Sequence, residues 1–119
     1  GASEPAPQIG RYVTASGFSL TGLDRAPDGA FFALERLFAP ILGARARITR
    51  IASLGGERIV GEELAVLAPP LPVDNFEGIA AVRLASGAVR IYIISDDNFS
   101  TRQRTLLYAF DLIEGESAP

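Results

Sequence analysis

The sequence lacks the residues on which several common kinds of catalytic site depend. Its 119 residues include no His, no Cys and no Met. Without His, no Ser-His-Asp or Cys-His arrangement is complete within the chain. Without Cys, disulfides, thiolate chemistry and sulfur-ligated zinc are excluded. Because Met is absent even at position 1, we expect a chain that has been processed or excised.

Long apolar runs and positive charge are also scarce. No apolar stretch approaches the roughly 18–20 residues of a membrane-spanning helix, so we expect no membrane span. All 11 positive side chains are Arg, against 14 Asp and Glu, and the net charge is -3. Such a surface repels an anionic polymer, so we expect no nucleic-acid partner. The hydrophobic fraction of 48%, interrupted by Gly, Pro and charge, indicates a globular protein.

Breaker residues divide the chain into two halves with similar patterns. Residues 1–8 are expected to form a disordered tail or to be a remnant of cloning. The Pro-rich stretch 68–72 ends the first half, so we expect one repeat over residues 9–68 and a second, incomplete repeat over 69–119. Leu20-Thr21-Gly22-Leu23-Asp24 corresponds to Phe76-Glu77-Gly78-Ile79-Ala80. The offset of about 56–61 residues is in the range of propeller and solenoid repeats.

Alternation of apolar and other residues predicts strands in both halves. Val89, Ile91 and Ile93 share one face of a predicted strand, for example. The predicted strands are 19–25, 30–36, 45–53 and 57–67 in the first repeat, and 76–84, 89–96 and 104–112 in the second. Apolar residues from Phe31 to Ile41 also fall at helical spacing. The repeat favours a strand through about Glu35, followed by a loop over 37–44.

Consecutive four-stranded antiparallel sheets are typical of β-propeller blades. We therefore predict an all-β fold with about two blades. The second blade lacks an outer strand, which residues 11–15 or sequence outside this chain would supply. Two blades cannot close a ring, so the expected partners are the remaining blades of a larger protein or further copies of this chain.

Carboxylates gather in the second repeat. Glu77 precedes Gly78 on the predicted innermost strand, and Asp96, Asp97 and Asn98 end the next one. Ca²⁺ takes six to eight oxygen ligands, so these side chains would make half of a calcium site. A bound cation would polarise a substrate oxygen or activate a water molecule. The alternative is an ordinary Asp-Asp-Asn turn, with Glu77 paired to an arginine.

Arginines follow this acidic turn. Arg102 and Arg104 are candidates to bind a phosphate or carboxylate, because guanidinium forms bidentate bonds with such groups. The alternative is an ion pair from either arginine to the acidic turn. In the first repeat, Asp24 and Glu35 occupy the matching places. We expect those two carboxylates to pair with nearby arginines, namely Arg25 or Arg36.

Three stretches carry a resemblance to a known family: Asn75-Phe76-Glu77-Gly78-Ile79, Ser95-Asp96-Asp97-Asn98-Phe99 and Gln103-Arg104-Thr105-Leu106. They resemble the C-terminal part of the β-propeller family called esterase-like activity of phytase, and the resemblance runs from about residue 17 to 112. It implies hydrolysis of ester or phosphoester bonds, with calcium, in a periplasmic or secreted setting. It also implies that Glu77, Asp96 and Asp97 are catalytic.

The alternative function is a propeller that binds or scaffolds without catalysis, its carboxylates balanced by arginines. Fold membership alone does not establish chemistry, so both functions stay open at this point. With either function, we expect this chain by itself to have negligible activity.

Overall fold

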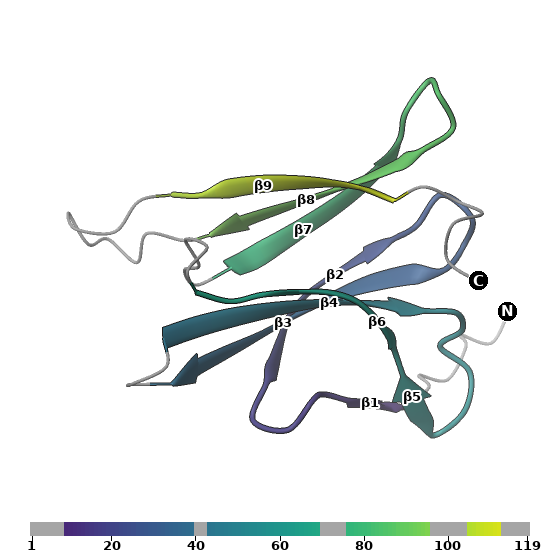
Figure 1. The fold of residues 1–119 in the computed structure, drawn as a ribbon. Helices are drawn as coiled ribbons and strands as arrows, with labels where there is room; N and C mark the ends of the chain where they lie inside the picture. The colour runs from purple at the N-terminus through teal and green to yellow at the C-terminus, as the bar shows by residue number, and fades with distance from the viewer. Residues whose placement is uncertain (1–8, 40–42, 70–75, 96–104, 113–119) are drawn as a thin grey trace, which may run out of the picture.

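Strands make up all the regular structure of the described residues. The computed structural model describes residues 9–39, 43–69, 76–95 and 105–112 (Figure 1). Nine strands and no helix lie in these ranges. The described residues form no helix long and apolar enough to cross a membrane. The predicted all-β fold with antiparallel sheets is confirmed and is compatible with propeller blades.

The strands form three sheets. In chain order they are β1 (Arg11–Val13), β2 (Ser19–Arg25), β3 (Phe31–Ala39), β4 (Gly43–Ile51), β5 (Arg58–Val60), β6 (Glu62–Leu67), β7 (Phe76–Arg83), β8 (Val89–Ser95) and β9 (Leu107–Leu112). The first sheet has the order β2-β3-β4-β6 and the second has the order β7-β8-β9. Both are antiparallel. β1 and β5 pair in parallel as a separate ribbon.

Three details differ from the predicted strands. β3 continues to Ala39, beyond its predicted end at about residue 35, and pairs with β4 along its whole length. The strand predicted over 57–67 is interrupted at Gly61, where a Cβ would lie 2.6 Å from Thr49 Oγ1. Because β1 pairs with β5, residues 11–13 do not supply an outer strand to the second sheet.

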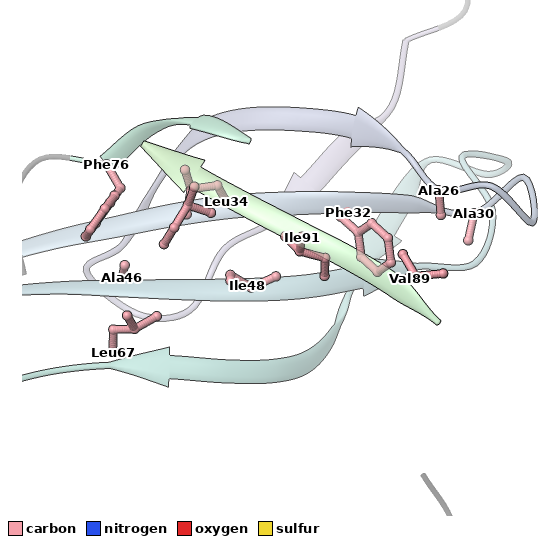
Figure 2. Close-up of a cluster of buried hydrophobic side chains, with 11 residues drawn as sticks. Ala26, Ala30, Phe32, Leu34, Ala46, Ile48, Leu67, Phe76, Val89 and Ile91 are labelled. Carbon is pink, nitrogen blue, oxygen red and sulfur yellow. The ribbon is translucent and has the colours of Figure 1, made fainter. Parts of the chain in front are cut away.

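The core lies between the first and second sheets. Figure 2 shows Phe32, Leu34 and Ile48 of the first sheet facing Phe76 and Ile91 of the second. Each of these side chains is at most 3% exposed. Burying an aliphatic or aromatic side chain of this size contributes roughly 1.5–3 kcal/mol. Contact between the two sheets is therefore the main stabilising interaction of the unit.

The first strands of the two sheets, β2 and β7, lie side by side (Figure 1). The Thr21 hydroxyl donates to the Phe76 carbonyl at 2.9 Å, and Asp24 Oδ2 accepts the Ala81 backbone N–H at 2.7 Å. A Cβ on Gly22 would lie 3.0 Å from Ile79 Cγ2, so glycine allows the close approach. Polar and apolar contacts thus fix one sheet against the other at this strand pair.

Phe76 tests how much stability the sheet interface provides. Because it is 0% exposed between the sheets, we expect Phe76→Ala to lower the free energy of unfolding by about 3–5 kcal/mol. Phe38, which is 72% exposed, is the matched control. Phe38→Ala should change stability by less than about 0.5 kcal/mol. Urea unfolding measures both, and equal losses would contradict an interface centred on Phe76.

Candidate functional site

Glu77 is the residue of the predicted site that the structure describes, and it occupies a β-bulge. Phe76 pairs with Ser95 and Gly78 pairs with Ile94, so Glu77 is an extra residue in β7. Its side chain is exposed. A bulge breaks the strict alternation of side chains and re-aims the inserted residue, and bulges are frequent beside active sites. The backbone therefore presents this carboxylate at the end of the second sheet.

The first sheet carries the same bulge at the equivalent place. Leu20 pairs with Glu35 and Gly22 pairs with Leu34, which makes Thr21 the inserted residue in β2. In both strands the bulged residue directly precedes a glycine. The two bulges therefore lie at equivalent positions of the repeat in which residues 20–24 correspond to 76–80. Thr21 hydrogen bonds to the neighbouring sheet, so in the first repeat the bulge serves packing.

Ser95 fixes the end of the second sheet beside Glu77. Its backbone N–H donates to the Leu106 carbonyl at 2.9 Å, and its hydroxyl accepts the Leu106 backbone N–H at 2.7 Å. Ser95 is 4% exposed and is the cross-strand partner of Phe76. Ser95, the last residue of β8, is thus held against Leu106, the residue before β9. Residues 96–104, which include most of the predicted site, fall between Ser95 and Leu106 in the sequence.

The rest of the predicted site lies outside the described residues: Asp96, Asp97, Asn98, Arg102 and Arg104. In the part of the chain that is described, no three His, Cys, Asp or Glu side chains are grouped to hold a metal ion. Glu77 alone is far short of the six to eight oxygens that Ca²⁺ takes. The described residues therefore do not by themselves build the predicted calcium site.

A buried polar cluster that sequence reasoning missed lies in the first repeat. Glu35 is 0% exposed, and its Oε2 accepts hydrogen bonds from the Tyr12 hydroxyl and from Arg47 Nη1, both at 2.5 Å. Its Oε1 accepts the Ala15 backbone N–H at 2.9 Å. The Tyr12 hydroxyl also lies 2.7 Å from Thr49 Oγ1. A buried carboxylate needs this many donors to offset its lost hydration, so the cluster holds residues 12–15 against the first sheet.

The cluster changes the acid–base properties of its members. Burial, together with the hydrogen bond to Glu35, raises the pKa of Tyr12 to about 12. For Arg47, burial works against the charged form. Its hydrogen bond to Glu63 and the charge of Glu35 outweigh that effect and raise its pKa. Arg47 therefore remains a cation between two carboxylates, with Nε 2.8 Å from Glu63 Oε1.

The ion pair expected at Glu35 is present, but with a different arginine. Glu35 pairs with Arg47, its cross-strand neighbour in β4. Successive residues of a strand point to opposite faces, so Arg36 points away from the face that Glu35 occupies. Asp24 accepts a backbone N–H from β7. The sequence did contain a signal for this cluster. Glu35 lies two residues after Ala33, on the same face of the strand, and a carboxylate that continues an apolar face indicates a buried, paired group.

The raised pKa of Tyr12 predicts a loss of stability at high pH. The unfolded chain releases this proton near pH 10, whereas the folded chain holds it to about pH 12. Stability provided by the protonated hydroxyl is therefore complete below pH 10 and is lost as the pH rises towards 12. Comparing urea unfolding of the wild type and Tyr12→Phe at pH 9, 10, 11 and about 12 measures this loss.

The same comparison isolates Tyr12 from the other tyrosines. The variant should be less stable by about 1–3 kcal/mol at pH 9, because Glu35 and Thr49 lose a partner. The difference between the two proteins should then shrink as the pH rises. A difference independent of pH would show that the Tyr12 proton is not held more tightly in the folded chain.

Comparisons with known proteins place the chain in a family. Residues 2–99 match the phytase-like family, described as esterase-like activity of phytase. No curated protein matches the chain, and no solved structure does. The matched range contains both bulges, the β2–β7 contact and the buried Glu35 cluster. Because the match covers more than half of the sequence, the chain belongs to the phytase-like family.

Proposed function

We propose that this chain forms two neighbouring blades of a β-propeller that hydrolyses ester or phosphoester bonds. In this proposal the reaction takes place at the end of the second sheet, where the bulge presents Glu77. Asp96 and Asp97 act with Glu77, and Arg102 and Arg104 bind the oxyanion of the substrate. The remaining blades come from a larger protein or from further copies of this chain. The periplasmic or secreted location is part of the proposal and rests on the family alone.

The bulge at Glu77 is the observation that carries this proposal. A carboxylate in a regular strand would project to one face of the sheet, whereas the bulged residue is re-aimed. Phe76 fills the core on one side, and Ser95 bonds the end of β8 to Leu106. Glu77 is thus exposed on a rigid support. Rigid support is what a catalytic carboxylate needs, because small displacements from the reacting geometry cost much of the rate.

A second candidate function is binding or scaffolding without catalysis. The first repeat favours it, because carboxylates there are engaged in holding the structure. Glu35 is surrounded by donors, and Asp28 pairs with Arg50 at 2.8 Å. If the second repeat follows the same pattern, Glu77 is another structural carboxylate. The two candidates differ in what Glu77→Gln does, since only the first makes turnover depend on that carboxylate.

Calcium is the proposed cofactor, with Glu77, Asp96, Asp97 and Asn98 as ligands. The bound ion would polarise a phosphoryl or carbonyl oxygen of the substrate. We expect calcium at tenfold its Kd to stabilise the wild-type chain by roughly 1.4 kcal/mol and to leave Glu77→Gln nearly unchanged. Thermal unfolding with calcium, and with magnesium as a control, measures this. Equal stabilisation of both proteins would remove Glu77 from the ligand set.

Hydrolysis is tested with 4-nitrophenyl phosphate and 4-nitrophenyl acetate over a range of chain concentrations. We expect negligible turnover from dissociated chains, because two blades leave the site incomplete. Turnover per chain should rise where the chain associates, and Glu77→Gln should lower it at least 100-fold. Glu57→Gln, which alters another exposed carboxylate, should leave it unchanged.

Each remaining outcome bears on one part of the proposal. Turnover proportional to concentration in a monomeric chain would overturn the expected inactivity of the two blades alone. Turnover indifferent to Glu77→Gln would move the reaction elsewhere. Association without turnover of either substrate would favour the scaffolding function.

A further inference from the structure

One face of the β1–β5 ribbon is open to solvent and takes no part in the proposed hydrolysis. The ribbon lies on the side of the first sheet that points away from the second sheet (Figure 1). Tyr12 bonds to Glu35 of the first sheet, and successive residues of a strand point to opposite faces. Arg11 and Val13, the neighbours of Tyr12 in β1, therefore point outward, away from the first sheet.

The parallel register brings two arginines together on this outward face. Arg11 is the cross-strand partner of Arg58, and Val13 is the cross-strand partner of Val60. Neighbouring strands lie about 4.8 Å apart, so two guanidinium groups from distant parts of the sequence extend side by side. Both arginines are exposed, and among the described residues no carboxylate forms an ion pair with either of them.

Two other strand pairs of this chain place an acidic residue opposite an arginine. Glu35 lies opposite Arg47 and forms a salt bridge with it. Arg90 and Asp111 do the same in the second sheet. Like charges opposite each other destabilise a strand pair, and the ribbon is only three residue pairs long. An anion held between its two guanidinium groups would offset their repulsion.

The two arginines border an open hollow of about 530 Å³, which is lined by Ile9, Arg11, Val13, Glu57 and Arg58. Sites of this size hold small molecules, with largely apolar walls and a few polar groups that fix the orientation of the ligand. Ile9, which is 88% exposed, and Val13 supply the apolar wall. Two arginines and one glutamate give the lining a net charge of +1, which matches a singly charged anion.

We propose that this hollow binds a small carboxylate that carries an apolar group. The carboxylate lies between Arg11 and Arg58, because the planar guanidinium group forms paired hydrogen bonds with carboxylate oxygens. The apolar group lies against Ile9 and Val13. None of these residues belongs to the proposed hydrolytic site, so this inference does not depend on the proposed function.

Binding is tested by NMR titration of the full chain with benzoate, and with acetate as the matched anion that lacks a ring. We expect benzoate to shift the guanidinium signals of Arg11 and Arg58. It should bind at least about tenfold more tightly than acetate, because its ring contacts the apolar wall. Equal affinities for the two anions would overturn the apolar part of the site. Unchanged signals of both arginines throughout the benzoate titration would overturn the site itself.

An arginine variant separates binding from folding. Arg58→Gln removes one of the two facing charges and should weaken benzoate binding at least about tenfold. It should not lower the Tm, because it also removes the repulsion between like charges. Arg83→Gln, at another exposed arginine, is the matched control and should bind benzoate like the wild type. Equal losses in the two variants would indicate attraction of anions to any surface arginine and would overturn the proposal.

Two further comparisons identify the kind of ligand. Ile9→Ser shortens the apolar wall, so it should weaken benzoate binding and leave acetate binding unchanged. Inorganic phosphate has no apolar part and should bind more weakly than benzoate. Tighter binding of phosphate than of benzoate would overturn the assignment to carboxylates and would make the hollow a phosphate site.

Discussion

The structure depends on the contact between the second sheet and the first. Neither sheet is large enough to be stable alone, since a sheet needs an apolar face packed against another layer. The core side chains come from both sheets, with Phe32, Leu34 and Ile48 on one side and Phe76 and Ile91 on the other. Thr21 and Asp24 add hydrogen bonds from β2 to the backbone of β7. The apolar contact has no directional preference, so it does not by itself set how one sheet is placed on the other. The hydrogen bonds fix that placement.

The two bulges connect this packing to the proposed chemistry. Each inserts one residue before a glycine, and each lies where its sheet meets a neighbour. In β2 the inserted residue is Thr21, whose hydroxyl binds the adjoining sheet. In β7 the equivalent residue is Glu77. A carboxylate cannot donate to a carbonyl as Thr21 does. The same backbone position therefore carries different chemistry in the two repeats, and the proposed function rests on this difference.

Much of the fold could be predicted from sequence because its signals are local. Alternation along Val89, Ile91 and Ile93 predicts β8, and all three side chains are buried on one face. The repeat of residues 20–24 at 76–80 predicts the equivalence of β2 and β7. The pairing of β1 with β5 and the contact of Tyr12 with Glu35 could not be predicted. They join residues far apart in sequence, and nothing local in the sequence specifies which segments meet.

The site was predicted less completely than the fold, for a related reason. Residue type identified Glu77 as a candidate, but its exposure at a bulge depends on the register of β7 against β8. The two ends of the unit also differ in a way that sequence did not reveal. The face of the first sheet that points away from the second sheet is covered by Tyr12 and Ala15, which bind Glu35. The face of the second sheet that points away from the first sheet has no cover among the described residues. The buried Glu35 thus belongs to the sheet that is covered on both faces, and the exposed Glu77 belongs to the sheet that keeps one face open among the described residues.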